Sequence, residues 1–193
     1  MKRGVPTLLL AQFLTAFADN AILFTAFAMI LQAGDVGEWY KPALQASFLV
    51  AFVVLAPWVG RLADRWPKAW VLAAGNGVKA LGAVMMLAHL EPLLAYAVVG
   101  IGAAVYGPAK YGVLPELVRH QQLVRANGWV EGSTIVAIVL GAVAGGVVAD
   151  RSLPWALAMV AAAYGVSLLT ALFIPKTRSP RAAPEAPALP AFV

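Results

Sequence analysis

Six apolar segments, each about 20 residues long, limit the folds open to this chain more than any other feature. A helix needs about 20 apolar residues, rising about 1.5 Å each, to cross the hydrocarbon core of a bilayer. Of the 193 residues, 62% are hydrophobic and 12% are charged, whereas about a quarter are charged in soluble domains. The sequence therefore predicts an all-α integral membrane protein with six transmembrane helices. We expect these helices over residues 6–31, 43–62, 70–90, 93–112, 128–149 and 154–174.

Basic residues are distributed unequally between the two sides of these segments. Lys41 and Arg151 fall on one side, and most of the other bases fall on the opposite side: Lys2, Arg3, Arg61, Arg65, Lys68, Arg119, Arg125, Lys176, Arg178 and Arg181. Because cytoplasmic loops carry an excess of Lys and Arg, both termini of this multi-pass membrane protein are predicted to be cytoplasmic. The net charge of +5 is thus a topology signal, and nucleic acid is not an expected partner.

Two further regions lie outside the apolar segments. Residues 114–126 are predicted to form either an interfacial helix that starts at Pro115 or a plain loop. After residue 175 the chain is rich in Pro and Ala. We therefore expect residues 1–175 to form the transmembrane bundle and residues 176–193 to form a disordered linker or tail.

A short motif occurs twice. Gly60-Arg-Leu-Ala-Asp64-Arg65 closes the second segment, and Gly146-Val-Val-Ala-Asp150-Arg151 closes the fifth. The predicted topology places the two copies on opposite membrane faces. Two three-helix units with the same signature on opposite faces indicate a 3+3 inverted repeat, an arrangement common in transporters.

Apart from Arg61 at the end of the second segment, four charged residues lie inside the predicted spans: Asp19, Lys79, Lys110 and Glu131. A charge at the centre of a membrane helix costs about 2.5–3.5 kcal/mol on insertion scales, so such residues face protein or water and have partners. Other polar residues extend them into stripes at helical spacing. We therefore expect one water-filled hollow at mid-depth that binds a substrate. Its candidate ligands are Asp19, Asn20, Asn76, Lys79, Tyr106, Lys110 and Glu131, and the stripes also include Gln12, Thr15, Asn127 and Thr134.

Each of these residues also has a purely structural interpretation. Asp19 and Asn20 can form a buried polar contact, and Asn76 and Lys79 can pair with a neighbouring span. Lys110 can extend its methylenes to the interface, or it can form a direct ion pair with Glu131, which would offset the cost of both charges. Glu131 can instead complement the positive end of its own helix.

Glycines and one proline predict local features of the fourth and fifth spans. Gly100, Gly102, Gly107, Gly141, Gly145 and Gly146 are expected to let helices approach closely. Pro108 lies between Gly107 and Lys110, and it is expected to bend its helix beside the lysine.

No enzyme signature is present. His89 and His120 fall at opposite predicted membrane faces, and the chain has no cysteine, so neither a shared metal nor a cofactor is expected. The phosphate-binding Gly-Lys-Ser/Thr loop and the Gly-x-Ser-x-Gly elbow are both missing from the sequence.

Gly60-x-x-x-Asp64-Arg65-x-x-Lys68 resembles the motif between helices two and three of the major facilitator superfamily. Longer stretches resemble its bacterial lysophospholipid transporters: residues 12–21, Gly107-Pro-Ala-Lys110-Tyr-Gly-Val-Leu-Pro-Glu116-Leu, and residues 126–135. In the superfamily the motif latches the cytoplasmic ends of two halves, which assigns Gly60, Asp64, Arg65 and Lys68 to a gating latch. Pro67 and Ala69 depart from the motif at a glycine and a base, so the latch is expected to be altered.

The resemblance implies a flippase that moves lysophospholipids such as lysophosphatidylethanolamine to the cytoplasmic leaflet. There an acyltransferase/acyl-carrier-protein synthetase, the family partner, reacylates them. Lys110 and Lys79 are then the candidate cations for the phosphate, and Asp19 or Glu131 the candidate anion for the ammonium.

The family has twelve spans in two halves, so we expect this chain to be an amino-terminal half that lacks its second six-helix half. It is expected to be a fragment or, less readily, to pair with a second copy or a separate half. Two alternatives stay open: a superfamily transporter for another amphiphile or a proton-coupled solute, and a non-transporting membrane subunit.

Overall fold

The computed structural model describes residues 4–34 and 37–175, except for the side chains of Leu62 and Asp64. In this part the chain forms six long helices, and each is long and apolar enough to cross a membrane. They are α1 (Gly4–Ala33), α2 (Tyr40–Arg65), α3 (Lys68–Leu87), α4 (Pro92–Leu117), α5 (Leu123–Arg151) and α6 (Leu153–Leu172), with the 3-10 turn η1 (His120–Gln122) before α5. The prediction of six transmembrane helices is confirmed. The predicted tail 176–193 lies outside the described residues.

Proline and extended residues set the ends of several helices. Pro92 occupies the first turn of α4, where a missing N–H costs nothing. Trp66 ends α2 in an extended conformation before Pro67, as expected for a residue that precedes proline. Between α3 and α4, His89 adopts a φ of 59° in the tight turn that joins the two helices.

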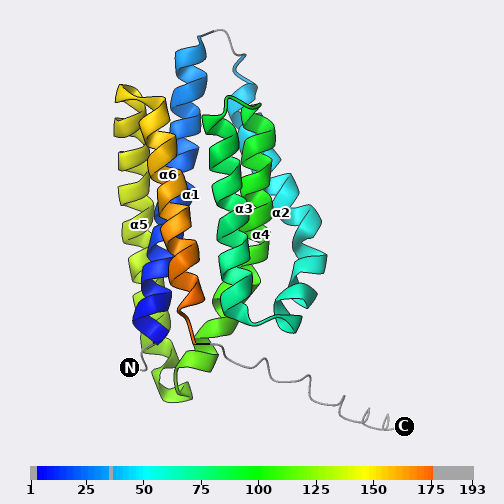
Figure 1. The fold of residues 1–193 in the computed structure, drawn as a ribbon, viewed down its shortest axis with the longest axis vertical. Helices are drawn as coiled ribbons and strands as arrows, with labels where there is room; N and C mark the ends of the chain where they lie inside the picture. The colour runs from blue at the N-terminus through cyan, green and yellow to red at the C-terminus, as the bar shows by residue number, and fades with distance from the viewer. Residues whose placement is uncertain (1–3, 35–36, 176–193) are drawn as a thin grey trace, which may run out of the picture.

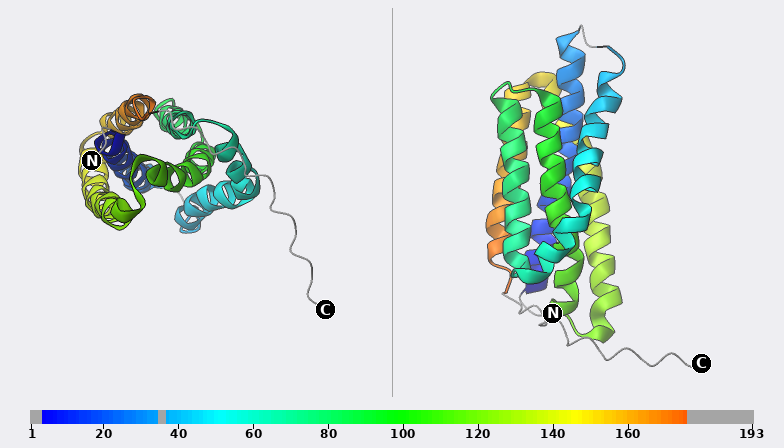
Figure 2. Two further views of the ribbon diagram at one scale, coloured as in Figure 1. Left: turned by 90° about the horizontal axis from the view of Figure 1, so that it is seen from below. Right: turned by 90° about the vertical axis from the view of Figure 1, so that its right-hand side faces the viewer.

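The helices form two groups of three, which Figure 2 separates in its left view. In one group α1 packs along α5 and α6, and in the other α4 packs along α2 and α3. The two groups meet where α3 packs on α6, and the contact between α1 and α4 is small. If α1, α2 and α3 trade places with α4, α5 and α6 in that order, the same pairs of helices pack together. The 3+3 repeat predicted from the duplicated motif is therefore present in the packing.

The ends of the helices agree with an inverted repeat. The motif glycine Gly60 lies near the carboxyl end of α2, and Gly146 lies near that of α5 (Figure 1). These two helices run in opposite directions, so the two motifs lie at opposite ends of the bundle. The amino end of α1 and the carboxyl end of α6 lie at the same end.

Close helix packing depends on a few glycines. A Cβ on Gly141 would lie 2.2 Å from the carbonyl oxygen of Phe17, and one on Gly145 would lie 2.4 Å from that of Ala21. Gly100 contacts the backbone of Phe48 in the same way. Small residues at these positions let the backbones of α5 and α1, and of α4 and α2, come together.

The prediction of close packing also holds for Gly102, but it is wrong for Gly107 and Gly146. A Cβ on either of these two would meet nothing within 4 Å among the described residues. Both glycines are half-buried, and no other described residue packs closely against them.

The predicted interfacial helix from Pro115 is also wrong. Helix α4 continues through Pro108 and Pro115 to Leu117, and α5 begins at Leu123, so only a short turn remains between them. Proline is compatible with the middle of a membrane helix where neighbouring groups satisfy the freed carbonyl.

Candidate functional site

Asp19 of α1 pairs with Lys79 of α3. The lysine Nζ lies 2.8 Å from both carboxylate oxygens, and Tyr164 of α6 donates its hydroxyl to Oδ1 at 2.8 Å. The side chain of Lys79 is 2% exposed and that of Asp19 is 31% exposed. Asp19 therefore lies between the buried ammonium of Lys79 and the surface of the bundle. Its carboxylate has partners inside the bundle and is not an unpaired charge facing lipid.

Aromatic rings complete the surroundings of the buried ammonium. The Nζ of Lys79 lies 5.0 Å from the centre of the Tyr106 ring and 5.8 Å from that of the Tyr164 ring. A ring face attracts a cation within about 6 Å, and it does so more strongly where water is excluded. Carboxylate and rings together offset the cost of removing this charge from water.

A second ion pair joins α4 to α5. The Nζ of Lys110 lies 3.3 Å from a carboxylate oxygen of Glu131, and it also faces the ring of Tyr111 at 5.0 Å. The lysine side chain is 12% exposed, whereas that of Glu131 is 52% exposed. Of the alternatives left open by the sequence, the direct pair is the one present, and Lys110 does not extend alone to the interface.

Hydrogen bonds link the neighbourhoods of the two pairs. Tyr106 donates its hydroxyl to Gln12 Oε1 at 3.1 Å, and Gln12 Nε2 donates to Thr134 Oγ1 at 3.2 Å. Thr134 lies about one turn from Glu131 on α5. A polar path therefore leads from Lys79 past Tyr106 and Gln12 to the α5 pair. The four charges form two separate pairs along this path and not one cluster.

Asn76 belongs to a different contact, a buried junction of three helices. Its Oδ1 accepts from Thr15 at 3.0 Å, and its Nδ2 donates to Ser167 of α6 at 2.9 Å. Asn76 and Ser167 are both fully buried. This geometry favours the structural interpretation of Asn76, which holds α1, α3 and α6 together.

Asn20 does not join the network formed by its neighbour. Its Nδ2 donates to the carbonyl of Ala16, four residues earlier in the same helix, at 2.9 Å. The side chain is half-buried, so the predicted contact between Asp19 and Asn20 gives way to a local bond within α1.

Two members of the network, Tyr164 and Ser167, were missed by the sequence analysis. They lie three residues apart on α6, a largely apolar helix, and both contact α1. The same rule of helical spacing that marked the other stripes would have identified them.

The predicted latch residues behave unequally. Lys68 is buried and pairs with Glu116 of α4 at 3.5 Å, so it lies inside the bundle. Arg65 is exposed, and a Cβ on Gly60 would meet nothing among the described residues. The side chain of Asp64 lies outside the described residues.

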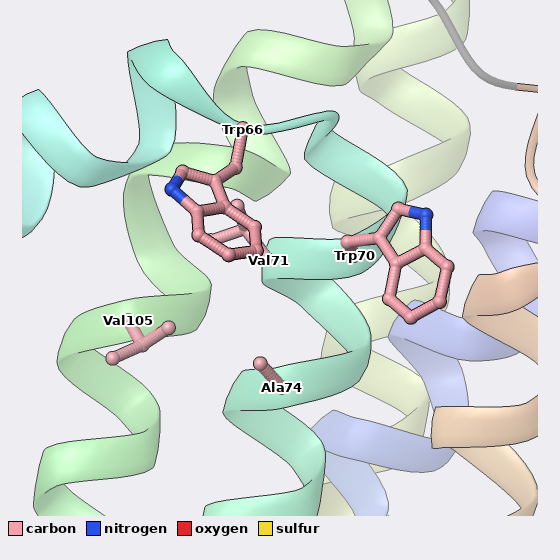
Figure 3. Close-up of a pocket in the computed structure, with 5 residues that line it drawn as sticks. All are labelled: Trp66, Trp70, Val71, Ala74 and Val105. Atoms are coloured by element: carbon pink, nitrogen blue, oxygen red, sulfur yellow. The ribbon is translucent and has the colours of Figure 1, made fainter.

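The face of α4 opposite Lys110 is apolar and hollowed. A cavity of about 250 Å³ is lined by Trp66, Trp70, Val71, Ala74 and Val105. Figure 3 labels these five side chains. A larger apolar groove of about 620 Å³ between α2 and α4 continues along Ile101 and Leu93. At 100° per residue, Val105 and Ile101 lie well away from Lys110 around α4. The charged path and the apolar grooves therefore use different sides of the helix.

The family model described as the Major Facilitator Superfamily matches residues 8–192. The "Lysophospholipid transporter LplT" of Yersinia enterocolitica serotype O:8 / biotype 1B is 46% identical over 181 residues, which cover 94% of this chain and 45% of that protein. The proteins of the same name from Yersinia pestis (strain Pestoides F) and Yersinia pseudotuberculosis serotype O:3 (strain YPIII) are 45% identical over 181 residues, covering 94% of this chain and 44% of each relative. The chain thus spans about half the length of the curated relatives it matches.

Proposed function

Because the chain belongs to the Major Facilitator Superfamily, we propose that it forms the amino-terminal half of a lysophospholipid transporter. The observation that carries this proposal is the 46% identity to a lysophospholipid transporter across 94% of the chain. The superfamily consists of transporters and not of enzymes, so no catalytic role is assigned to the ion pairs.

Transport by this half requires a second bundle against which it can move. Alternating access works by the rocking of one repeat against another around a fixed site. Helices α2 and α5 have large exposed apolar faces, which include Leu49, Val53, Ile135 and Val139. Such faces are suited to contact with a second six-helix half as well as with lipid. Gly60, Arg65 and Asp64 are proposed to contact that half at the end of α2.

The charged path is suited to a zwitterionic headgroup. We assign Lys110 to the phosphate, because it is partly exposed and its only carboxylate partner among the described residues is the half-exposed Glu131. Asp19 or Glu131 accepts the ammonium. Lys79 is too deeply buried to reach a substrate, so its proposed role is to orient Asp19. The ring of Tyr106 faces the ammonium group of Lys79 and stabilises its charge.

The direction of movement is proposed from the distribution of bases. Both termini of the chain are assigned to the cytoplasmic side, and the released lysophospholipid to the cytoplasmic leaflet of the inner membrane. The acyl chain stays in an apolar groove or in the bilayer while the headgroup crosses. An acyltransferase/acyl-carrier-protein synthetase is the proposed partner for reacylation.

A second candidate function is proton-coupled transport of another solute. The half exposure of the Glu131 carboxylate, which leaves it open to the outside of the bundle, is the observation that favours this candidate. The third possibility, a membrane subunit that transports nothing, gives the charged path no role beyond folding.

The test measures movement of lysophosphatidylethanolamine across proteoliposomes that contain this chain together with the remaining half of a curated relative. We expect Lys110→Ala to lower the initial rate at least tenfold, because the phosphate loses its cation. Lys41→Ala is the matched control: it removes a lysine near one membrane face, away from the path, and should leave the rate unchanged.

Three outcomes would overturn the assignment. Equal rates for Lys110→Ala and the unaltered chain would remove the charged path from transport. Uptake of another solute driven by a pH gradient and lost in Glu131→Gln, without lysolipid movement, would favour the second candidate. No transport of any kind, in a complex that assembles correctly, would favour the non-transporting subunit.

A further inference from the structure

A small cavity with a cationic wall lies where α1, the α4–α5 connection and α5 meet. Its volume is about 290 Å³, and it is lined by Val5, Val118, Gln122, Arg125, Ala126 and Trp129. Val5 and Ala126 are buried and form an apolar floor, whereas Arg125, Gln122 and Trp129 are exposed around it. The cavity therefore combines an apolar base with a rim of hydrogen-bond donors.

The rim donors have no partner in the described part of the chain. Arg125 forms no ion pair with a described residue, since the three pairs found there involve Lys68, Lys79 and Lys110. The amide of Gln122 and the indole N–H of Trp129 likewise donate to no described residue. A guanidinium, an amide and an indole are all donors, so the cavity is suited to an anion, and the planar guanidinium matches a phosphate in particular.

The cavity is separate from the charged path. Trp129 precedes Glu131 by two residues, which places it about 160° away around α5 at 100° per residue. Arg125 precedes Glu131 by six residues and lies about 120° away from it around α5. A ligand in this cavity is therefore held on the other side of the helix from the ion pair.

An apolar stripe leads from the cavity along the same side of α5. It consists of Trp129, Val136, Leu140 and Val147, and each of these is about half exposed. From Trp129 to Leu140 the helix rises about 16 Å, which is close to the thickness of one leaflet, about 15 Å. A free phosphate would leave this stripe unused, whereas an acyl chain would follow it. The occupant that fits both parts is a membrane phospholipid.

We propose that this cavity binds a non-transported anionic phospholipid, such as phosphatidylglycerol, with the headgroup phosphate on Arg125 and an acyl chain along α5. Basic pockets between membrane helices hold anionic headgroups, and a base near the surface favours an anionic lipid by about fivefold. The unpaired charge of Arg125 gives the preference for a headgroup of net negative charge. The site does not depend on which lipid is transported.

The first test is native mass spectrometry of the whole chain in detergent with equimolar phosphatidylglycerol and phosphatidylcholine. We expect the unaltered chain to retain phosphatidylglycerol about fivefold better, and Arg125→Gln to lose that preference. Arg119→Gln is the matched control, because it removes an exposed arginine from the same end of the bundle that does not line the cavity. An equal loss in both variants would reduce the effect to general surface charge and overturn the proposal.

The second test places the lipid at the cavity. In the variant for this test, phenylalanine replaces every tryptophan except Trp129, so all indole fluorescence comes from Trp129. The variant is placed in phosphatidylcholine vesicles that contain either brominated phosphatidylglycerol or brominated phosphatidylcholine, and the quenching of its fluorescence by the two lipids is compared. We expect stronger quenching by the anionic lipid, lost in Arg125→Gln. Equal quenching by both lipids would contradict the site. Release of the quenching by soluble glycerol phosphate would show that the headgroup alone binds, and would overturn the assignment to a lipid.

Discussion

Removal of either partner of the Asp19–Lys79 pair should destabilise the bundle, but by different amounts. Loss of one member of a buried ion pair costs about 3–5 kcal/mol, because the remaining charge is left uncompensated. The side chain of Lys79 is 2% exposed and cannot reach water, whereas that of Asp19 is 31% exposed. The cost therefore depends on which charge is left behind.

Asp19→Asn leaves the buried ammonium with only the two tyrosine rings and an amide oxygen. We expect its cost to approach the upper part of that range, about 4 kcal/mol. Lys79→Met leaves a carboxylate that water can reach and that keeps the hydrogen bond from Tyr164. Its expected cost is about 1.5–3 kcal/mol, the value of hydrogen bonds to a charged group.

The double variant Asp19→Asn/Lys79→Met removes both charges and should cost less than the sum of the single variants. Residues in direct contact show interaction free energies of about 0.5–3 kcal/mol. The free energy of unfolding is measured by titration with SDS in mixed micelles, followed by far-ultraviolet circular dichroism, and Lys41→Met is the control. Strict additivity, or a larger cost for Lys79→Met than for Asp19→Asn, would refute the reasoning.

Two further predictions concern packing and are measured as thermal stability in detergent. Gly145→Ala should cost about 1–3 kcal/mol, because its Cβ would lie 2.4 Å from the carbonyl oxygen of Ala21, whereas Gly146→Ala meets open space and should not destabilise. Equal effects of the two would contradict the close approach of α5 and α1. Ser167→Ala should cost about 1–3 kcal/mol, because the buried amide of Asn76 loses its hydrogen-bond acceptor. Thr170→Ala removes an exposed hydroxyl from the same helix and should change stability by less than about 0.5 kcal/mol. A neutral Ser167→Ala would remove the three-helix junction from the account of stability.

Much of the architecture could be predicted, because length and hydropathy determine which segments cross a bilayer. The six spans and the repeat of three helices follow from the apolar runs and from the duplicated motif at Gly60 and Gly146. The ends of the helices do not follow from the apolar runs alone. Helix α4 continues past its predicted end and through Pro115. A proline in the sequence does not by itself show where a membrane helix ends, because neighbouring groups in the folded protein can satisfy the carbonyl that it frees.

The pairing of charges could not be predicted from the sequence. Two acids and two lysines allow more than one set of pairs, and only the neighbours of each helix decide between them. Helix α6 packs against both α1 and α3, whereas α1 has few contacts with α4, so Asp19 meets Lys79 and not Lys110. The same reason explains the glycines: Gly145 and Gly146 are adjacent in sequence but lie on different sides of α5, and only one of them faces α1.

The central claim is that the Lys110–Glu131 pair lies on a polar face that receives the headgroup. Because the chain has no cysteine, single cysteines can be introduced without further changes. Glu131→Cys and Leu140→Cys form a matched pair, since both positions are about half exposed and lie on opposite sides of α5.

The measurement is the rate at which a water-soluble maleimide labels each cysteine in proteoliposomes, with and without lysophosphatidylethanolamine. We expect rapid labelling at position 131 that slows at least fivefold when the lysolipid is added, and little labelling at position 140. Equal labelling at the two positions, or labelling at 131 that the lysolipid does not change, would contradict the claim.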